Sequence, residues 1–524
     1  MSKTFYVTTP LYYVNAEPHI GHAYTTLAAD VLVRHKRARG GSAFLLTGTD
    51  EHGANIEKVA KAAGKSPQAW SDEVAARFRT MWEALGIRFD DFIRTTEPRH
   101  EKQVQKVFER LLKSGDIYRG SYEGLYCLPC EAYYDEGELL AGNCPVHGRA
   151  VEHLREESYF FKLSRFEKPL LDYYEKHPEF LAPSWRASEL TNWVKSGLKD
   201  ISVSRTKVAW GIPVLSDPKH TIYVWFDALQ NYITAIGYDP DIGAVPGAGG
   251  RGRSTFHEGE PSPEPGTRNR SSFEELWPAD VQLVGKEIYR FHGVIWPAML
   301  MALDLPLPRQ VFAHGWWTVE GEKMSKSRGN MIDPRELVAE YGVDALRYFL
   351  FREVPFGGDG DFSREAFKTR YNADLANGLG NLTARVIQLV EKNLAGEIPR
   401  RPALEGKVFG TGVLAKQSEK IYAAMDALAF HEALGLIWEQ IAELNRTVDR
   451  EKPWATAKTD PEAFKFLMFD LVWSLRLISD WIAPFMPETA RKMQEQLGAQ
   501  AAGGWGKLAK GDSLFPRKTE EKAP

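Results

Sequence analysis

The order of strand-like and helix-like segments near the N-terminus restricts the fold more than any other feature of the chain. Residues 4–9, TFYVTT, are β-branched and aromatic, as in a strand, and apolar residues recur at helical spacing from about residue 20 to residue 39. The run AFLLT, residues 43–47, resembles a second, buried strand and precedes another segment of helical spacing. Strands that alternate with helices form parallel sheets. We therefore expect an α/β domain built on a parallel sheet.

The remainder of the 524-residue chain divides into regions of different character. Strand-like runs resume at Thr221, Val281 and Arg309 after a long interruption, and long amphipathic helices follow residue 371. This order predicts a doubly wound, Rossmann-type sheet that carries an insertion and is followed by an α-helical bundle. The predicted regions are the first half of the α/β domain at 1–114, the insertion at 115–207, the second half at 208–314 with a Gly- and Pro-rich loop at 243–272, a lysine-rich loop region at 315–370, the bundle at 371–498 and a tail at 499–524.

Composition and charge exclude several classes of protein. With 43% hydrophobic and 26% charged residues, the chain has the composition of a soluble globular protein. A net charge of −4 excludes a polycationic surface, so nucleic acid would have to bind at local basic patches. The N-terminal residues resemble neither a secretory signal nor a transit peptide, and no run of about 18 apolar residues occurs. We expect a cytoplasmic protein without a membrane segment.

All three cysteines lie in one short stretch, YCLPCEAYYDEGELLAGNCPVHGR. The spacing of Cys127, Cys130, Cys144 and His147 provides two knuckles and four ligands, which suits a tetrahedral structural zinc ion. A redox-active C-x-x-C pair is one alternative, although it would open a helix after a strand and leave Cys144 and His147 unexplained. Buried small hydrophobic side chains are the other alternative. A zinc ion with four protein ligands has no open position for a substrate, so the chemistry must lie elsewhere.

Two motifs are typical of a nucleotide site. PHIGH, residues 18–22, follows the first strand and opens a helix, where backbone N–H groups and the imidazoles of His19 and His22 can bind phosphate oxygens. GEKMSKSRGN, residues 321–330, places three cations among small residues, as in a flexible clamp for polyphosphate. Each motif has an ordinary alternative, since the histidines could cap the helix and the lysine-rich string could be a solvated charge run. One motif in each half of a doubly wound sheet predicts a nucleotide site where the strand order reverses.

These motifs carry a resemblance to a known family. HIGH at residues 19–22 and KMSKS at residues 323–327 are the two signatures of class I aminoacyl-tRNA synthetases. The wider context resembles the bacterial methionyl-tRNA synthetase family over nearly the whole chain. The stretches that carry this resemblance are, in order, TTPLYYVNAEPHIGHAY, TGTDEHG, VWFDALQNY, GKEIYRFHGVIWPAML, HGWWTVEGEKMSKSRGN and VDALRYFLFRE.

The resemblance implies a ligase that acts in two steps. L-methionine and ATP would give methionyl-adenylate and pyrophosphate, and the methionyl group would pass to the terminal adenosine of initiator and elongator tRNA(Met). His19 and His22 would hold phosphate oxygens in the transition state, Lys323 and Lys326 would bind the leaving pyrophosphate, and Mg²⁺ would share that charge. The ATP-binding positions implied by the two motifs are His19, Gly21, His22, Lys323, Met324, Ser325, Lys326 and Ser327.

The resemblance also implies an amino-acid pocket. Asp50 would pair with the ammonium group of methionine, and aromatic side chains would surround its thioether. From the residues alone, Trp225 and Trp296 could equally be core, and Asp50 could cap the next helix. Some relatives have Ala-Pro where this chain has Ala228 and Leu229, so the pocket wall differs there. The methionine-binding positions implied by the family are Leu11, Tyr13, Asp50, Trp225, Ala228, Tyr232, Ile288, Phe291, His292 and Trp296.

The family places a zinc knuckle in the insertion and reads the tRNA anticodon with the bundle. Many relatives have four cysteine ligands, whereas the fourth position here is His147. Asn381 and Arg385 lie four residues apart on one helix and could hydrogen-bond base edges, while Trp454 could stack on an unpaired base. A place in the bundle core is the alternative for Trp454.

Three other functions remain to be distinguished. Another class I synthetase shares both signatures, but a cysteinyl enzyme needs an open zinc position and the valyl type needs a larger insertion. A small-molecule nucleotidyltransferase would need neither the knuckle nor the bundle. A non-catalytic tRNA-binding paralogue predicts loss of His19, His22 or Lys326, all of which are present. Because the sequence leaves no room for the C-terminal dimerising domain of some relatives, we expect a monomer.

Overall fold

The computed structural model describes residues 3–128, 132–134, 136–146, 148–241, 271–319, 321–323, 332–398, 411–500 and 505–518. The chain forms two compact units. Unit 1 comprises Met1–Pro18, Gly40–Glu83 and Ile87–His314, and unit 2 comprises His19–Arg39, Ala84–Gly86 and Gly315–Pro524. Among the described residues, no helix is both long and apolar enough to cross a membrane.

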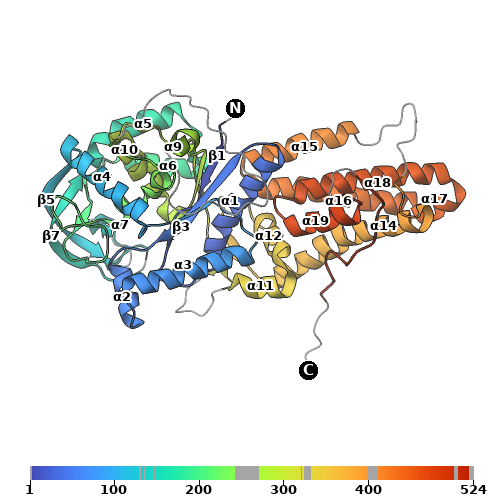
Figure 1. Ribbon diagram of the computed structural model, residues 1–524, viewed down its shortest axis with the longest axis horizontal. Coiled ribbons are helices and arrows are strands. Elements are labelled where there is room, and N and C mark those ends of the chain that lie inside the picture. Colours follow the sequence, from blue (N-terminus) through green and yellow to red (C-terminus); the bar gives the residue numbers. More distant parts are fainter. Residues whose placement is uncertain are drawn as a thin grey trace. The chain divides into compact units, whose positions relative to one another are not determined.

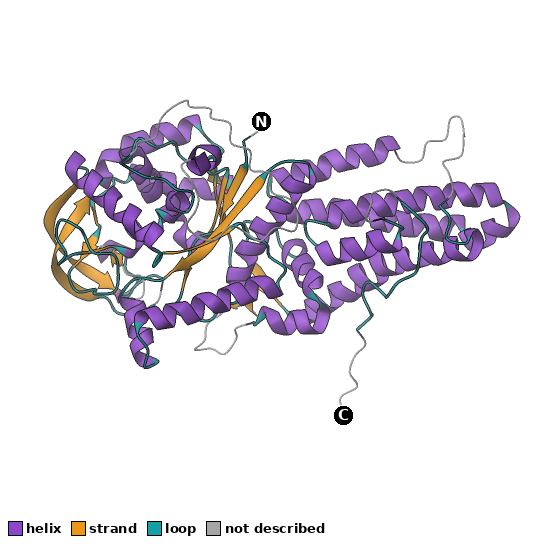
Figure 2. Ribbon diagram, viewed as in Figure 1, coloured by secondary structure: helices purple, strands orange, loops and turns teal. Residues whose placement is uncertain are grey.

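A parallel sheet forms the centre of unit 1 (Figure 2). Its strands lie in the order β4, β3, β1, β12, β13, β8, and β2 pairs with β3 beyond the end of β1. Every pairing in this sheet is parallel, and the strand order reverses at β1, as in a doubly wound fold. The predicted parallel α/β domain is therefore confirmed. The bounds are β1 Phe5–Thr8, β2 Tyr12–Tyr13, β3 Ala43–Asp50, β4 Asp91–Arg94, β8 Leu181–Ala182, β12 Val281–Gly285 and β13 Val311–His314.

Helices of unit 1 connect these strands, and some of them, such as α8, are buried almost completely. In α3 the Ser66 hydroxyl accepts a hydrogen bond from Ala69 N at 3.2 Å and so caps the helix. The Tyr12 ring of β2 stacks on Phe78 of α3 and meets Trp82 edge-on, so α3 covers that part of the sheet. The helices are α2 Ala54–Ala62, α3 Pro67–Ala84, α4 Pro98–Ser114, α5 Glu167–Lys176, α6 Ser184–Lys195, α7 Val224–Ala228, α8 Asn231–Thr234, α9 Ser271–Leu276 and α10 Trp296–Ala302, with a π-helix, η5, at Phe291–Ile295.

The predicted insertion contains a separate antiparallel sheet. Its strands lie in the order β6, β5, β7, β9, and Figure 1 shows the long strands β5 and β7 side by side. The short strand β8 also falls within residues 115–207, yet it joins the edge of the main sheet beside β13. The bounds are β5 Ile117–Cys127, β6 Ala132–Tyr134, β7 Glu152–Phe161, β9 Ile201–Ser202 and, in a further two-stranded sheet, β10 Ser204–Arg205 and β11 Thr221–Ile222.

The prediction of a strand from Thr221 onward is wrong. Only Thr221 and Ile222 are extended, in antiparallel pairing with β10, and the run continues as helix α7. This segment is almost entirely buried, and a short buried helix cannot be distinguished from a buried strand by periodicity. The strands predicted at Val281 and Arg309 correspond to β12 and β13 and are confirmed. Of the predicted loop 243–272, residues 243–270 lie outside the described part of the chain and 271–272 begin α9.

Unit 2 consists mainly of helices, which Figure 2 shows packed along one another beyond residue 371. Helix α1 belongs to this unit. The buried guanidinium of Arg347 on α12 donates to Asp30 of α1 at 2.6 Å and to Phe485 O at 2.7 Å, which joins three segments of the unit. The helices are α1 Ile20–Ala38, α11 Pro334–Tyr341, α12 Val343–Arg352, α13 Arg364–Arg370, the π-helix η7 Tyr371–Gly380, α14 Asn381–Leu394, α15 Thr411–Asp426, α16 Phe430–Glu451, α17 Pro453–Thr459, α18 Pro461–Ile482 and α19 Pro487–Gln496.

Candidate active site

An aromatic cluster in unit 1 brings together most of the predicted methionine-binding residues. The ring of Trp225, on α7, stacks on Phe291 with centroids 3.8 Å apart and planes inclined by 4°. The ring of His292 lies edge-on to Trp225 at 6.3 Å. Leu11, Tyr13, Trp225 and Ile288 are partly buried and pack against the same core, whereas Ala228, Tyr232, Phe291, His292 and Trp296 are buried within it. The predicted side chains therefore line one apolar region that is partly open to solvent.

The protonation of His292 is determined by its two hydrogen bonds. Its Nδ1–H donates to the Ile288 carbonyl at 3.0 Å, so its Nε2 accepts from the Tyr232 hydroxyl at 2.6 Å. Burial lowers the pKa of His292 to about 4, and burial also raises the pKa of Tyr232. Both side chains are thus neutral at physiological pH, which suits an uncharged substrate side chain.

The backbone conformation around His292 is unusual. Phe291 and His292 lie in the π-helix η5, a form that occurs mostly as single turns at functional sites. Trp296 follows on α10, fully buried, with its ring 5.9 Å from that of Tyr232. Its Nε1–H lacks a hydrogen-bond partner among the described residues. Trp296 therefore forms the inner wall of the cluster, behind Tyr232.

Asp50 is the last residue of β3 and lies opposite Tyr13 of β2. A Cβ atom at the preceding Gly48 would approach Ile93 O to 1.9 Å and the Leu11 side chain to 2.9 Å, so only glycine permits this packing. The sequence TGTDEHG thus brings β3 close to both neighbouring segments and places Asp50 at the carboxyl end of the sheet. Ligands of doubly wound folds bind at this end.

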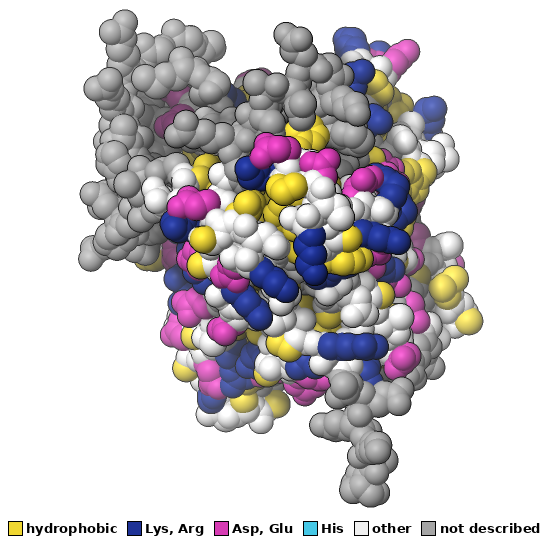
Figure 3. Space-filling view, turned by 90° about the vertical axis from the view of Figure 1, so that its right-hand side faces the viewer, with side chains coloured by type: hydrophobic (Ala, Val, Ile, Leu, Met, Phe, Trp, Pro, Cys, Tyr) yellow, Lys and Arg dark blue, Asp and Glu magenta, His cyan; other side chains and the backbone are white. Residues whose placement is uncertain are grey.

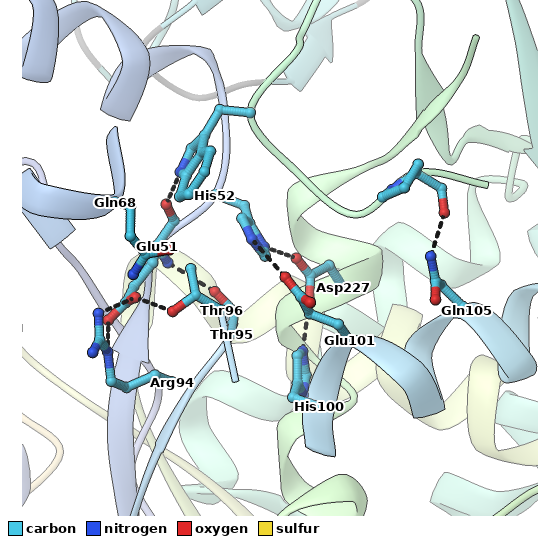
Figure 4. A network of polar contacts seen from close by, with 12 residues as sticks. Glu51, His52, Gln68, Arg94, Thr95, Thr96, His100, Glu101, Gln105 and Asp227 are labelled. Atoms are coloured by element: carbon cyan, nitrogen blue, oxygen red, sulfur yellow. Dashed lines mark hydrogen bonds and ion pairs between the residues drawn. The ribbon is translucent and has the colours of Figure 1, made fainter. Parts of the chain in front are cut away.

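A network of buried charges surrounds the segment after Asp50, and sequence reasoning missed it (Figure 4). His52 Nδ1 is 2.7 Å from one oxygen of Asp227, and His100 Nε2 is 2.6 Å from the other. All three side chains are buried. Glu51, also buried, receives two hydrogen bonds from the Arg94 guanidinium, at 2.7 and 2.9 Å. The only sequence signal was the adjacency of Glu51 and His52 to Asp50.

The HIGH motif opens helix α1 in unit 2. His19 is the N-cap: its Nδ1 accepts from Gly21 N at 3.1 Å, and His22 Nδ1 accepts from His19 N at 3.3 Å. The two rings stack at 3.8 Å, and burial together with the nearby His19 lowers the pKa of His22 well below its usual value. With each Nδ1 acting as an acceptor, a ring proton must reside on Nε2. The capping role is therefore present, and it leaves both histidines able to donate through Nε2.

The KMSKS motif is only partly within the described residues. Lys323 ends the strand β15, Glu322–Lys323, which pairs with β14, Trp317–Val319, in a sheet completed by β16, Gly360–Phe362. Asp361 accepts hydrogen bonds from Gly321 N at 2.8 Å and from the Thr318 hydroxyl at 2.7 Å, which fixes the turn before Lys323. Met324, Ser325, Lys326 and Ser327 lie outside the described part of the chain.

Half of the predicted zinc ligands are described. Cys127 and Cys144 are buried in one small cluster with Tyr134, and Cys127 closes the β5–β6 hairpin opposite Ala132. This hairpin differs from the strand followed by a helix that a redox C-x-x-C pair requires. Cys130 and His147 lie outside the described residues, and no metal-ligand cluster occurs among the residues that are described.

The predicted anticodon residues lie on neighbouring helices of unit 2. Asn381 is the exposed first residue of α14, and the Arg385 guanidinium is 5.8 Å from the ring centroid of Trp454 on α17. Trp454 is 49% exposed, so a place in the bundle core is excluded. Figure 3 looks onto the end of the bundle where Figure 1 places α17, and lysine and arginine side chains gather there beside hydrophobic ones. The exposed indole thus lies beside an arginine that also pairs with Asp449 at 2.9 Å, and indoles and guanidinium groups are side chains on which unpaired bases stack.

Comparison with known proteins agrees with this geometry. The family described as tRNA synthetases class I (M) matches residues 5–153 and 135–387. The chain is 47% identical to a methionine–tRNA ligase from Caldanaerobacter subterraneus subsp. tengcongensis, covering 100% of this chain and 80% of that protein. It is 43% identical to a methionine–tRNA ligase from Bacillus subtilis, covering 99% and 79%.

Among solved structures, the Mycobacterium tuberculosis methionyl-tRNA synthetase in complex with methionyl-adenylate superposes with a TM-score of 0.88 at 38% identity, covering 98% of this chain and 100% of that chain. The apo form of the same enzyme gives a TM-score of 0.83 at 35% identity, covering 99% of each chain. A match of this extent and identity, on a chain that carries both signature motifs, shows descent as well as fold. The chain therefore belongs to the class I tRNA synthetase (M) family.

Proposed function

We propose that this chain is a methionine–tRNA ligase that activates L-methionine with ATP and then aminoacylates tRNA(Met). The observation that carries the proposal is the neutral, buried pair formed by Tyr232 and His292 beside the stacked rings of Trp225 and Phe291. Ring edges and faces make favourable contacts with a thioether sulfur, and an unbranched chain can enter where a β-branched one cannot. The methionine–tRNA ligases at 43% to 47% identity support the same substrate.

The first step needs no nucleophile from the protein. A carboxylate oxygen of methionine forms a bond to the α-phosphorus of ATP, and the bond from that phosphorus to the bridging oxygen breaks, releasing pyrophosphate. Catalysis then depends on positioning and on stabilising charge on the phosphates. The Nε2–H groups of His19 and His22 donate to phosphate oxygens, and Lys323 and Lys326 bind the leaving pyrophosphate. Mg²⁺ bound with ATP supplies further positive charge at the same oxygens.

In the second step a hydroxyl of the terminal adenosine of tRNA attacks the carbonyl carbon of the adenylate, and AMP leaves. Asp50 holds the ammonium group of methionine through both steps by a charge-assisted hydrogen bond. Asn381, Arg385 and Trp454 bind the anticodon, the arginine and the amide at base edges and the indole by stacking. Because the product is consumed in translation, the cytoplasm is the proposed location.

The insertion binds one structural zinc ion through Cys127, Cys130, Cys144 and His147. The donor set suits zinc, since three thiolates and one imidazole complete a tetrahedron. The described part of the site supports this: Cys127 and Cys144 share one cluster, and Gly148 N donates to Cys144 O at 2.8 Å. Such an ion stabilises a small sheet that has little core of its own.

Methionine-dependent exchange of pyrophosphate into ATP tests the proposal. The expected result is exchange with L-methionine and, at equal concentration, at least 100-fold slower exchange with leucine or cysteine, roughly what an unfit side chain costs. Exchange that does not depend on methionine, or equal exchange with leucine or cysteine, would refute it. A His19→Ala and His22→Ala pair should lower the exchange rate without changing binding of methionine alone.

A further inference from the structure

Three backbone groups that closely follow Asp50 are hydrogen-bonded to other segments of unit 1. Glu51 N donates to the Thr95 hydroxyl at 2.9 Å, the Trp210 indole donates to Glu51 O at 2.5 Å, and Gly53 N donates to Trp210 O at 2.9 Å. Segments that leave the end of a strand are usually mobile and solvated. This one is instead held rigidly, which indicates that the position of Asp50 matters.

The Glu51 side chain anchors this segment to β4. Its two oxygens receive the paired bonds of Arg94 and further bonds from the Thr49 and Thr96 hydroxyls, each at 2.6 Å. Glu51 is fully buried, and a buried carboxylate is tolerated only when its lone pairs are satisfied. This contact fixes the segment relative to its own sheet and leaves its distance from α7 undefined.

The His52 side chain supplies the link to α7. It is hydrogen-bonded to one oxygen of Asp227, whose other oxygen is hydrogen-bonded to His100 (Figure 4). His100 Nδ1 is in turn 2.7 Å from the Thr234 hydroxyl oxygen. Burial alone would lower the pKa of His52, but the Asp227 carboxylate, aided by Glu101 and Glu51, raises it. Burial would raise the pKa of Asp227, and the two imidazoles lower it instead. The carboxylate is therefore ionised and holds an imidazole on each side.

Asp227 lies in α7 between Trp225 and Ala228, both of which are predicted to contact methionine. The His52–Asp227 bond thus joins the segment that begins at Asp50 to the helix that carries the aromatic wall. A buried charged group of this kind is often no more stabilising than an apolar replacement of similar volume. Its presence is better explained by a need for defined geometry.

We propose that Asp227, bound between His52 and His100, is a positioning residue that sets the place of Asp50 relative to α7. Its position then determines how well the site recognises the ammonium group of the substrate, an inference that rests on the proposed function. Asp227 contacts no substrate atom in this proposal. It acts through His52 on the carboxylate of Asp50, and through its own helix on the wall that receives the methionine side chain.

The proposal separates two parts of methionine. The ammonium group depends on Asp50, whereas the thioether depends on the aromatic rings. If Asp227 positions Asp50, loss of the Asp227 carboxylate must weaken the binding of ligands that carry an ammonium group. It must weaken the binding of 4-(methylthio)butanoate, which lacks an ammonium group, to a smaller extent. A purely structural role would weaken both to the same extent, because the whole pocket would deform.

The experiment uses Asp227→Asn, in which the amide can accept a hydrogen bond from one imidazole but not from the second. Steady-state exchange gives the KM for methionine and for ATP, and inhibition of exchange gives the affinity for 4-(methylthio)butanoate. The expected result is a rise of about tenfold in the KM for methionine, equal to about 1.4 kcal/mol. The KM for ATP and the affinity for 4-(methylthio)butanoate should each change by less than about twofold. Gln105→Ala is the matched control, because Gln105 is a partly exposed residue of the same helix as His100 and donates to Pro213 O at 3.0 Å, away from Asp227.

A second pair of variants serves if Asp227→Asn does not fold. His100→Gln retains a donor for Asp227 and should keep the wild-type KM for methionine, whereas His100→Leu removes the donor and should raise it. An unchanged KM in folded Asp227→Asn or His100→Leu, or equal weakening of methionine and 4-(methylthio)butanoate, overturns the inference. Absence of methionine-dependent exchange in the wild type would instead overturn the proposed function, and no variant is needed to see it.

Discussion

Replacing Tyr232 by Phe removes a single hydroxyl from the methionine pocket and leaves the ring in place. That hydroxyl donates to His292 Nε2 at 2.6 Å, and both side chains are buried. His292 cannot turn to find another partner, because its Nδ1–H is bound to Ile288 O at 3.0 Å. The variant therefore leaves one imidazole nitrogen as a buried acceptor without a donor.

An unsatisfied buried acceptor costs about 1–3 kcal/mol. If a water molecule enters to donate to Nε2, part of that cost is recovered, but the pocket becomes hydrated at the place where the thioether must bind. We therefore expect the free energy of unfolding to fall by about 1–2 kcal/mol and the KM for methionine to rise about five- to tenfold, since 1.4 kcal/mol corresponds to a factor of ten. The KM for ATP should not change, because the proposed function assigns these residues to the amino acid and not to ATP.

Tyr6→Phe is the matched control. The Tyr6 hydroxyl is also buried and donates to the backbone carbonyl of Tyr232 at 2.9 Å, so its loss leaves an unsatisfied acceptor on the same residue but away from His292. We expect a similar loss of stability with an unchanged KM for methionine. Urea unfolding and pyrophosphate exchange measure the two quantities. Equal changes in the KM for methionine in both variants, or no change in either quantity for Tyr232→Phe, would refute this account of the pocket.

Four further outcomes are expected. Burial lowers the pKa of His292 to about 4, so between about pH 4 and 6.5 the unfolded chain binds more protons than the folded chain. The free energy of unfolding should therefore increase with pH across that range, by about 3 kcal/mol from this group. His292→Gln should flatten this pH dependence. Arg347→Met removes the guanidinium that donates to Asp30 at 2.6 Å and to Phe485 O, and leaves Asp30 with Arg34 at 2.7 Å; it should lower stability by about 3 kcal/mol in calorimetry, with partial recovery in the double variant Asp30→Leu/Arg347→Met. Trp454→Ala should reduce tRNA charging by about tenfold while exchange is unchanged, and equal loss in both assays would exclude an anticodon role. Purified protein should contain about one zinc ion and melt at a lower temperature after chelation, whereas less than about half an equivalent would contradict the zinc site.

The sequence predicted those parts of the fold that depend on local signals. Helix α1 was expected from about residue 20 to residue 39 and spans Ile20–Ala38, because its apolar spacing is regular and a glycine pair follows it. The segment after Thr221 failed because burial on all sides removes the periodicity that separates helix from strand. Strand β8 was not foreseen, since two residues are too few to carry a pattern.

The site was predictable only where it coincides with motifs. The family resemblance named Trp225, Tyr232 and His292, and the structure brings them into one cluster. The partners of Asp227 were missed because His52 and His100 are 175 and 127 residues away in the sequence, and no local pattern connects them. Contacts between side chains distant in sequence arise only when the sheet is assembled.

The two π-helical segments show how helix register sets both predicted binding surfaces. Segment η5 carries Phe291 and His292, and η7 ends immediately before Asn381. An extra residue in a helix rotates the side chains that follow by about 100° relative to an α-helical path. Side chains of α16 bind two carbonyls of η7: the Trp438 indole donates to Asp374 O at 3.3 Å, and the Asn445 amide donates to Gly378 O at 3.3 Å. The orientation of Asn381 and Arg385 therefore depends on side chains of a neighbouring helix that would contact no RNA, just as the proposed place of Asp50 depends on Asp227.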